Sequence, residues 1–250
     1  MMTFETSIAS CDEQSITVRG LDLTEDIIDD FDFGEFFYFH FTGERPSPGE
    51  SRLFNAALVT AVEHGFTPSV IAARLTYTCA PEALQGAVAS GLLGAGRNLL
   101  GSMENAAEIL QTGVARVEKG EEMGNVAVDI VASHDRLPGY GHPLHEPTDP
   151  RAEVLLEMLD QEGYAGQYVD MLLAIQTAGE EAYETSLLVN ATGALAALIS
   201  ELGLPPMAGR GIVLVSRAAG LVGHLHEEMQ HPTAFDIWEL VEDEAQYCGE

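Results

Sequence analysis

Basic residues are scarce in this sequence. Its 250 residues include 11 Lys and Arg against 40 Asp and Glu, which gives a formal net charge of −29. Lysine occurs once, as Lys119, so nearly all of the positive charge is arginine. Phosphate backbones and anionic lipid surfaces repel a protein this acidic, so nucleic acid and membrane surfaces are not expected as partners. The excess of acid is also typical of proteins from salt-accumulating halophiles, in which multimolar salt screens the repulsion.

Cysteine and long hydrophobic segments are scarce as well. The three cysteines, Cys11, Cys79 and Cys248, show no CxxC spacing, so neither a disulfide framework nor a cysteine zinc site is predicted. The longest uncharged apolar stretches, 83–96 and 185–200, are shorter than the roughly 18 residues that a membrane-spanning helix needs. The first residues lack the pattern of a signal peptide. We therefore expect a cytoplasmic protein without a membrane span.

Apolar residues make up 46% of the chain, an ordinary value for a folded protein, and most of them recur at helical spacing. Residues 6–19 instead alternate apolar and polar side chains around the turn sequence CDEQ, which predicts a short hairpin. A short helix and an aromatic helix that stops at Gly43 are expected in 21–43, and Ser47 with Glu50 predicts a capping box. Further helices are predicted over 48–64, 69–75, 81–93, 103–117, 126–134, 151–159, 165–177, 187–202 and 211–228.

Four glycines, Gly91, Gly94, Gly96 and Gly101, interrupt one apolar region. Because glycine has no Cβ, this density indicates that something approaches the backbone closely. Close packing of two helices explains the pattern, and so does a ligand that passes over the backbone. The sequence leaves both explanations open.

The segment 137–152, LPGYGHPLHEPTDPRA, contains His142 and His145 among too many Gly and Pro residues for a helix. A polar loop between apolar helices often carries function. At its end, Asp149 is expected to cap a helix that has Pro150 in its first position. Arg151 then lies in the first turn, where backbone amides favour an anion; a surface ion pair is the alternative interpretation of this residue.

The remaining histidines form no clear motif. His64 ends a predicted helix, where it either stabilises the helix C-terminus or points into a cleft. His224, His226 and His231 are close in sequence but lack an HExxH arrangement, so no metal site is predicted. The absence of GxGxxG, GxxxxGK[ST] and GxSxG motifs argues against nucleotide hydrolysis and serine hydrolase chemistry.

Several segments, taken in order, resemble the citrate synthase superfamily. GYGHPLHEPTDPRA (139–152) resembles its glycine-histidine loop followed by Asp-Pro-Arg, and TSIASCDEQSITVRGLDLTED (6–26) resembles its N-terminal hairpin. The most similar variant is the citryl-CoA lyase module, the citrate synthase homology part of ATP-citrate lyase. The similarity continues through 37–50, 63–74, 90–110, 187–205 and 215–228.

This resemblance implies an all-α, two-domain helical fold that assembles as a homodimer or a higher homo-oligomer. The large domain would comprise 1–103 and 199–250, and the small domain 104–198 would carry the glycine-histidine loop. The implied enzyme makes or breaks the carbon–carbon bond between acetyl-CoA and oxaloacetate, with CoA as a substrate and no permanently bound cofactor. By position, the catalytic residues of the family correspond to His64, His142 and Thr192, its carboxylate-binding residues to Arg151, Arg217 and His145, and its CoA-binding residues to Gly94, Gly96, Gly139 and Gly141.

The sequence departs from the family at three places. Residues 99–102 lack the His-Gly-Gly motif of citrate synthases, as the citryl-CoA lyase module also does, and Pro143 replaces an arginine after the loop histidine. Thr192 stands where the family has its catalytic Asp, and losing such a base typically costs about 10²–10⁴-fold in rate. Two hypotheses follow: an enzyme in which His145, His224 or Glu146 supplies the base, and a non-catalytic subunit that binds a CoA ester or a carboxylate.

Overall fold

The computed structural model describes residues 4–96, 102–141 and 147–249. The chain begins with a small antiparallel sheet in the order β1-β2-β3, formed by β1 (Ala9–Cys11), β2 (Ile16–Val18) and β3 (Leu21–Asp22). Asp12 closes the first turn, because its carboxylate accepts the backbone amides of Gln14 and Ser15 at 2.8 and 2.9 Å. The predicted hairpin is therefore confirmed, with a third strand added.

The predicted capping signals also hold. The π-helical turn η1 (Leu23–Ile27) leads to α1 (Phe33–Thr42) and then to α2 (Pro48–Val62). The Ser47 side chain accepts the amide of Glu50, and the Glu50 side chain accepts the amide of Ser47 in return. Gly43 ends α1 with φ 85°, a left-handed conformation that glycine adopts without steric cost.

Helices make up most of the remaining described chain, in agreement with the expected fold class. They are α3 (Pro68–Cys79), α4 (Leu84–Leu93), α5 (Ser102–Val117), α6 (Met123–Ala132), α7 (Pro150–Gln161), α8 (Gln167–Tyr183), α9 (Ala191–Glu201), α10 (Pro206–Gln230) and α11 (Ala234–Glu244).

Several helix starts and one whole helix differ from the sequence prediction: α10 begins at Pro206 rather than at 211, and α6 at Met123 rather than at 126. α4 begins at Leu84 because the preceding residues form a turn closed by the amide of Ala83 on the carbonyl of Ala80. α9 begins at Ala191, since Val189 forms an isolated antiparallel bridge with Tyr140. The helix α11 was not predicted. Its first amides, on Thr233 and Ala234, are accepted by Glu228 of α10, a cap that no local pattern announces.

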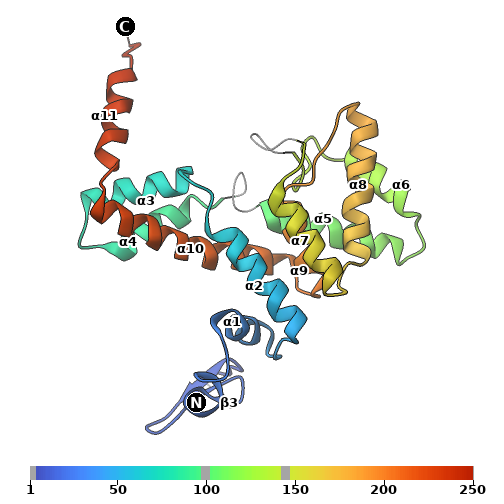
Figure 1. Cartoon of the computed structure of the whole chain (residues 1–250), viewed down its shortest axis with the longest axis horizontal. Helices are drawn as coiled ribbons and strands as arrows, with labels where there is room; N and C mark the ends of the chain where they lie inside the picture. Colours follow the sequence, from blue (N-terminus) through green and yellow to red (C-terminus); the bar gives the residue numbers. More distant parts are fainter. Residues whose placement is uncertain (1–3, 97–101, 142–146, 250) are drawn as a thin grey trace.

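The helices pack around two main apolar clusters, and α10 takes part in both. The larger cluster includes Leu53 of α2, Leu110 of α5 and Leu198 of α9, and the smaller one joins Val70 of α3 to Leu221 of α10. In Figure 1, α3, α4 and α11 lie at one end of the molecule and α5 to α9 gather at the other. The large cluster contains residues of both predicted domains, and the boundaries at 104 and 198 stay a prediction.

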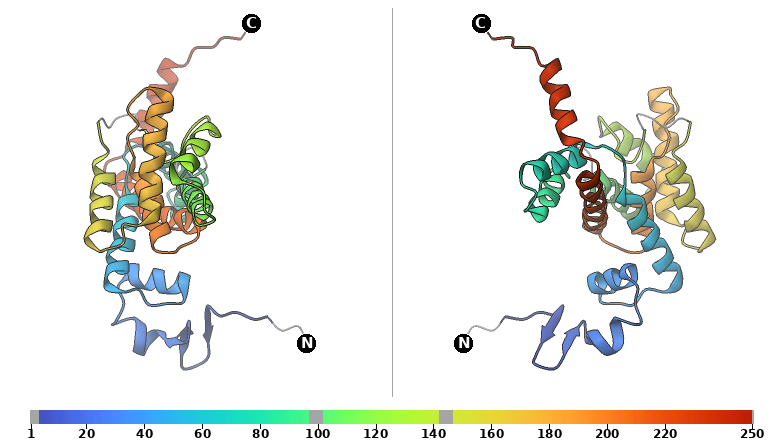
Figure 2. Two further views of the ribbon diagram at one scale, coloured as in Figure 1. Left: turned by 90° about the vertical axis from the view of Figure 1, so that its right-hand side faces the viewer. Right: turned by 60° about the vertical axis from the view of Figure 1, so that its left-hand side comes forward.

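The last helix projects from the body of the molecule, as both views of Figure 2 show. Phe235 and Trp238 on α11 are 55% and 58% exposed, and Val241 follows them along the helix at 61%. These large apolar side chains therefore lack a covering surface within the described part of the chain. Within that same part, the helices are too short or too polar to cross a membrane.

Candidate functional site

A cavity of about 170 Å³ lies where six helices meet, namely α2, α3, α5, α7, α9 and α10. The end of α2, the start of α3, the start of α9 and the middle of α10 each contribute to its wall, and the first turn of α7 adds a cation. Its polar lining includes Glu63, His64, Arg151, Asn190, Thr192 and Arg217. The fold thus brings together residues that are more than 150 positions apart in the sequence.

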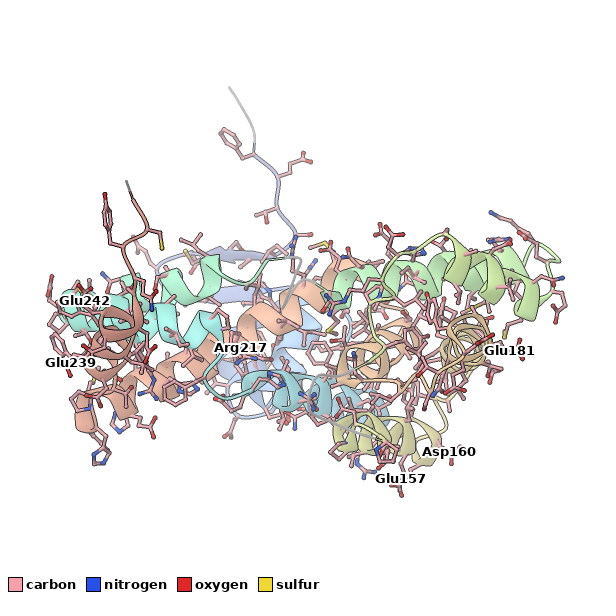
Figure 3. The ribbon with its side chains drawn as sticks, turned by 90° about the horizontal axis from the view of Figure 1, so that it is seen from above. Glu157, Asp160, Glu181, Arg217, Glu239 and Glu242 are labelled. Atoms are coloured by element: carbon pink, nitrogen blue, oxygen red, sulfur yellow. The ribbon has the colours of Figure 1, made fainter. Side chains whose placement is uncertain are left out.

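Arg217 dominates the chemistry of this cavity. Its side chain is buried on α10, with the residue 3% exposed, and its Nε and Nη1 atoms have no hydrogen-bond partner among the described residues. Burial lowers the pKa of Arg217, and the negative charge of Glu63 partly offsets this effect. In Figure 3, Arg217 lies near the middle of the molecule, away from the labelled acidic residues. A buried guanidinium with unused N–H groups is suited to bind an anion with two oxygens, such as a carboxylate.

Arg151, the second cation of the cavity, is held by Asp149. The Asp149 carboxylate accepts Nε and Nη2 of Arg151 at 3.0 and 2.8 Å, and also the backbone amide of Arg151 at 3.0 Å. The Arg151 side chain remains 30% exposed and lines the cavity. Arg151 is therefore both an ion-pair partner and a cavity residue, so the two interpretations of its sequence position are compatible.

Asp149 caps α7, as predicted, but its role is larger than that of a cap. Its side chain is fully buried, and its Oδ2 atom also accepts the backbone amide of Ala191 at the start of α9. Burial raises the pKa of Asp149, but hydrogen bonds from Arg151 and from the amide of Ala191 outweigh it and lower the pKa to about 2. One ionised carboxylate thus joins the first turns of α7 and α9 and orients Arg151.

The first turn of α9 is built on Asn190. The Asn190 side chain accepts the amides of Thr192 and Gly193 and donates to the carbonyl of Gly141 at 2.7 Å. A Cβ on Gly193 would lie only 2.5 Å from the carbonyl oxygen of Gly139, which has φ 96°. The segment 139–141 therefore packs directly on the start of α9 and leaves Thr192 in the cavity wall.

Another part of the cavity wall comes from the segment between α2 and α3. The amides of His64 and Gly65 both donate to Oε1 of Glu63, at 2.8 and 2.6 Å, and His64 lines the cavity. Of the predicted functions of His64, a position in a cleft is therefore the one that the structure supports. Glu63 pairs in turn with Nε2 of His224 at 3.0 Å.

The glycines of the predicted CoA path serve different purposes. A Cβ on Gly91 would lie 2.7 Å from Leu221 and 2.9 Å from the carbonyl oxygen of Ser69, so close helix packing accounts for this residue. Gly94 lines the cavity, and a Cβ on Gly96 would meet nothing within 4 Å. Contact of Gly94, Gly96, Gly139 and Gly141 with CoA stays a prediction, to which the structure adds a packing role for Gly139.

The family model described as "Citrate synthase, C-terminal domain" matches residues 3–237. The chain belongs to the citrate synthase family. The curated relatives include the citrate synthase of Heyndrickxia coagulans, 29% identical over 83% of this chain and 55% of the relative, and that of Haloferax volcanii, 27% identical over 86% and 54%. The chain thus spans about half the length of the curated relatives that it matches.

Among solved structures, the citryl-CoA lyase of Hydrogenobacter thermophilus matches this citrate synthase family member over its whole length. The TM-score is 0.90 at 28% identity, and the match covers 100% of this chain and 96% of the lyase. The ATP citrate lyase of Methanothrix soehngenii, solved with citrate and coenzyme A, has the same fold, with a TM-score of 0.79 at 18% identity over 100% of this chain and 42% of the lyase. The resemblance inferred from sequence motifs is confirmed, as is the mostly helical fold.

Some of the predicted site residues lie outside the described chain, and the cavity contains others that were not predicted. His142 and His145, together with Glu146 and Gly101, lie outside the described residues. The structure adds Glu63 and Asn190 to the cavity, and places His224 beside Glu63 and Arg74 rather than with His226, whose ring contacts Gln230. Asn190 had a readable signal, because an Asn before an apolar helical run is a common N-cap. Glu63 had none.

Proposed function

We propose that the cavity binds a citrate-like carboxylic acid together with the acyl end of a CoA thioester, and that the chain makes or breaks the carbon–carbon bond between acetyl-CoA and oxaloacetate. The observation that carries this proposal is Arg217, whose buried Nε and Nη1 atoms have no hydrogen-bond partner in the described chain. Leaving such donors unpaired is costly, so a native ligand with carboxylate oxygens is expected to pair them.

The proposed chemistry divides the work between cations and histidines. Arg217 and Arg151 would hold carboxylates, and His64 and His142 would stabilise the reacting oxygens of the substrates. In the synthetic direction, a base removes a proton from the thioester methyl group. The resulting enolate carbon bonds to the carbonyl carbon of oxaloacetate, and the carbonyl oxygen takes up a proton to give citryl-CoA. The lyase direction reverses these steps.

The residue at the position of the family's base favours a second candidate function. Thr192 lines the cavity in the first turn of α9, where a hydroxyl replaces the expected carboxylate. A hydroxyl does not accept a carbon-bound proton at neutral pH without a base of its own. A non-catalytic subunit that binds a carboxylate or CoA ester on the same fold is therefore the alternative.

Turnover assays separate the two candidates. Thiol release from acetyl-CoA plus oxaloacetate, and oxaloacetate release from citryl-CoA, would be followed in multimolar KCl, with calorimetry of CoA and citrate alongside. Turnover in either direction supports the enzyme. Binding without turnover supports the non-catalytic subunit, and an increase in rate for Thr192→Asp would then identify the missing base as its cause. Absence of both binding and turnover contradicts both candidates.

Substitution of Arg217 tests the site itself. Arg217→Met is expected to weaken citrate or oxaloacetate binding by roughly 100-fold, the usual order for removing a buried charged partner. It should not lower the free energy of unfolding, since it removes a buried guanidinium whose Nε and Nη1 atoms have no hydrogen-bond partner within the described residues. Arg210→Met is the matched control, because Arg210 is half-exposed on the same helix and pairs with Glu104. Equal binding by the two variants would contradict the proposal.

A further inference from the structure

A chain of hydrogen bonds leads from a fully buried arginine to the cavity wall. Arg74 of α3 is 0% exposed, pairs with Glu228 at 2.8 Å and with Glu227, and lies 4.7 Å above the ring of Phe66. Its Nη2 atom lies 2.9 Å from Nδ1 of His224. The Nε2 atom of His224 then lies 3.1 and 3.0 Å from the two carboxylate oxygens of Glu63.

The chemistry of arginine fixes the direction of every bond in this chain. A guanidinium only donates, so Nδ1 of His224 accepts from Arg74 and carries no proton. The single proton of the neutral imidazole is therefore on Nε2, where it donates to Glu63. In this arrangement His224 acts as a neutral connector between two residues whose charges are fixed.

At the end of the chain, Glu63 orders the segment that carries His64. Its Oε1 atom accepts three donors, the amides of His64 and Gly65 and Nε2 of His224. Gly65 has φ 70°, so the turn is tight and is stabilised by these bonds. Burial raises the pKa of Glu63, but the hydrogen bonds from His224 and the two amides outweigh it and hold the pKa below its ordinary value.

Glu63 also faces the cation of the site. Glu63 and Arg217 line the same cavity, and the negative charge of Glu63 favours the protonated form of Arg217. In the unliganded protein this charge partly balances Arg217 without occupying its Nε and Nη1 atoms. A bound dicarboxylate would be attracted by the positive charge of Arg217 and repelled by the negative charge of Glu63.

We propose that Glu63, held by His224 and Arg74, is a positioning and specificity-determining residue of the carboxylate site: its Oε1 atom sets the geometry of the His64 turn, and its charge limits how much anionic charge the cavity accepts. This inference deepens the proposed function and rests on it for the nature of the ligand. It assigns two separable effects to one side chain.

Two substitutions of Glu63 separate these effects. Glu63→Gln keeps an Oε1 acceptor for the amides of His64 and Gly65 but removes the charge, so oxaloacetate should bind roughly threefold to tenfold more tightly. Glu63→Ala removes the acceptor as well and frees the His64 turn, so binding should weaken relative to Glu63→Gln by roughly tenfold or more. Equal changes in affinity for the two variants, or no change for either, would overturn the proposal.

Substitutions of His224 test the connector. His224→Leu should weaken oxaloacetate binding by roughly tenfold, because Glu63 loses its imidazole donor. His224→Gln, whose amide can accept from Arg74 and donate to Glu63, should restore most of that loss. His226→Leu, an exposed residue on the same helix, is the control and should bind normally. A purely structural role predicts that affinity follows the melting temperature across all three variants, and that result would refute a positioning role.

The protonation of His224 can be tested without any ligand. Nitrogen-15 NMR of the ligand-free protein should show one protonated and one unprotonated ring nitrogen, with the proton on Nε2, and His224→Leu identifies the signals. A proton on Nδ1, or on both nitrogens, would overturn the directed chain. If the unsubstituted protein binds neither oxaloacetate nor citrate, the proposed function fails, and the NMR result still decides whether the connector exists.

Discussion

Asp149 offers the sharpest test of the energetics of this site. Its pKa falls from 3.8 to about 2 in the folded protein, and each unit of pKa is worth about 1.4 kcal/mol, so ionised Asp149 contributes about 2 kcal/mol of stability. The folded pKa is the lower one, so this contribution is complete above the unfolded pKa and is lost as the pH falls through about 2. Asp149→Asn should therefore lower the free energy of unfolding by about 2 kcal/mol at pH 7.

Urea denaturation at constant high KCl measures this difference. Asp160→Asn is the control, since Asp160 lies on the exposed side of the same helix, where Figure 3 labels it. The gap between the unsubstituted protein and Asp149→Asn should narrow as the pH falls from about 5 toward 3, because Asp149 of the unfolded chain takes up a proton near 3.8 while the folded chain keeps it ionised until about 2. A loss no larger than that of the control, or a gap that does not depend on pH, would refute the assignment of Asp149 as a buried ionised link between α7 and α9.

Three other measurements test different parts of the molecule. Gly193→Ala should destabilise the fold by about 2 kcal/mol or more, because its Cβ would lie 2.5 Å from a backbone oxygen. Gly211→Ala is the control: its Cβ would meet nothing within 4 Å, so the substitution should stabilise α10 by about 0.5–1 kcal/mol. Similar melting temperatures for the two variants would contradict this packing. The melting temperature should rise steadily from about 0.1 to 2 M KCl as salt screens the charge of −29, and a flat response would count against adaptation to salt. If the chain dimerises through α11, dilution should expose Trp238, the single tryptophan, and shift its fluorescence to longer wavelength. If sedimentation shows that the dimer dissociates while the spectrum stays unchanged, α11 is not the dimer interface.

The features that could be predicted from the sequence are those whose partners are neighbours in the chain. Ser47 caps α2 through Glu50, three residues away, and Pro150 follows the cap of α7 directly. Gly43 ends α1 through its own backbone conformation. Short sequence patterns encode local interactions of this kind, and they predicted most of the helices.

The features that could not be predicted depend on partners that lie in another helix or far away in the chain. Glu228 caps α11 from the end of another helix, and Asp149 reaches the amide of Ala191, 42 residues later. The family resemblance predicted Arg217 as a carboxylate-binding residue. That its guanidinium is buried beside Glu63, with donors unused, follows only from the packing of α10 against the end of α2.

The position of Arg217 within α10 would couple binding of the proposed carboxylic acid to the stability of both apolar clusters. α10 has 25 residues, about 37 Å at 1.5 Å per residue, and its first half packs Ile212 into the large apolar cluster while its second half packs Leu221 into the small one. Arg217 lies between these two anchors. Unfolding of either cluster would fray the helix that carries the guanidinium, so an acid bound there opposes the opening of both ends of the molecule at once.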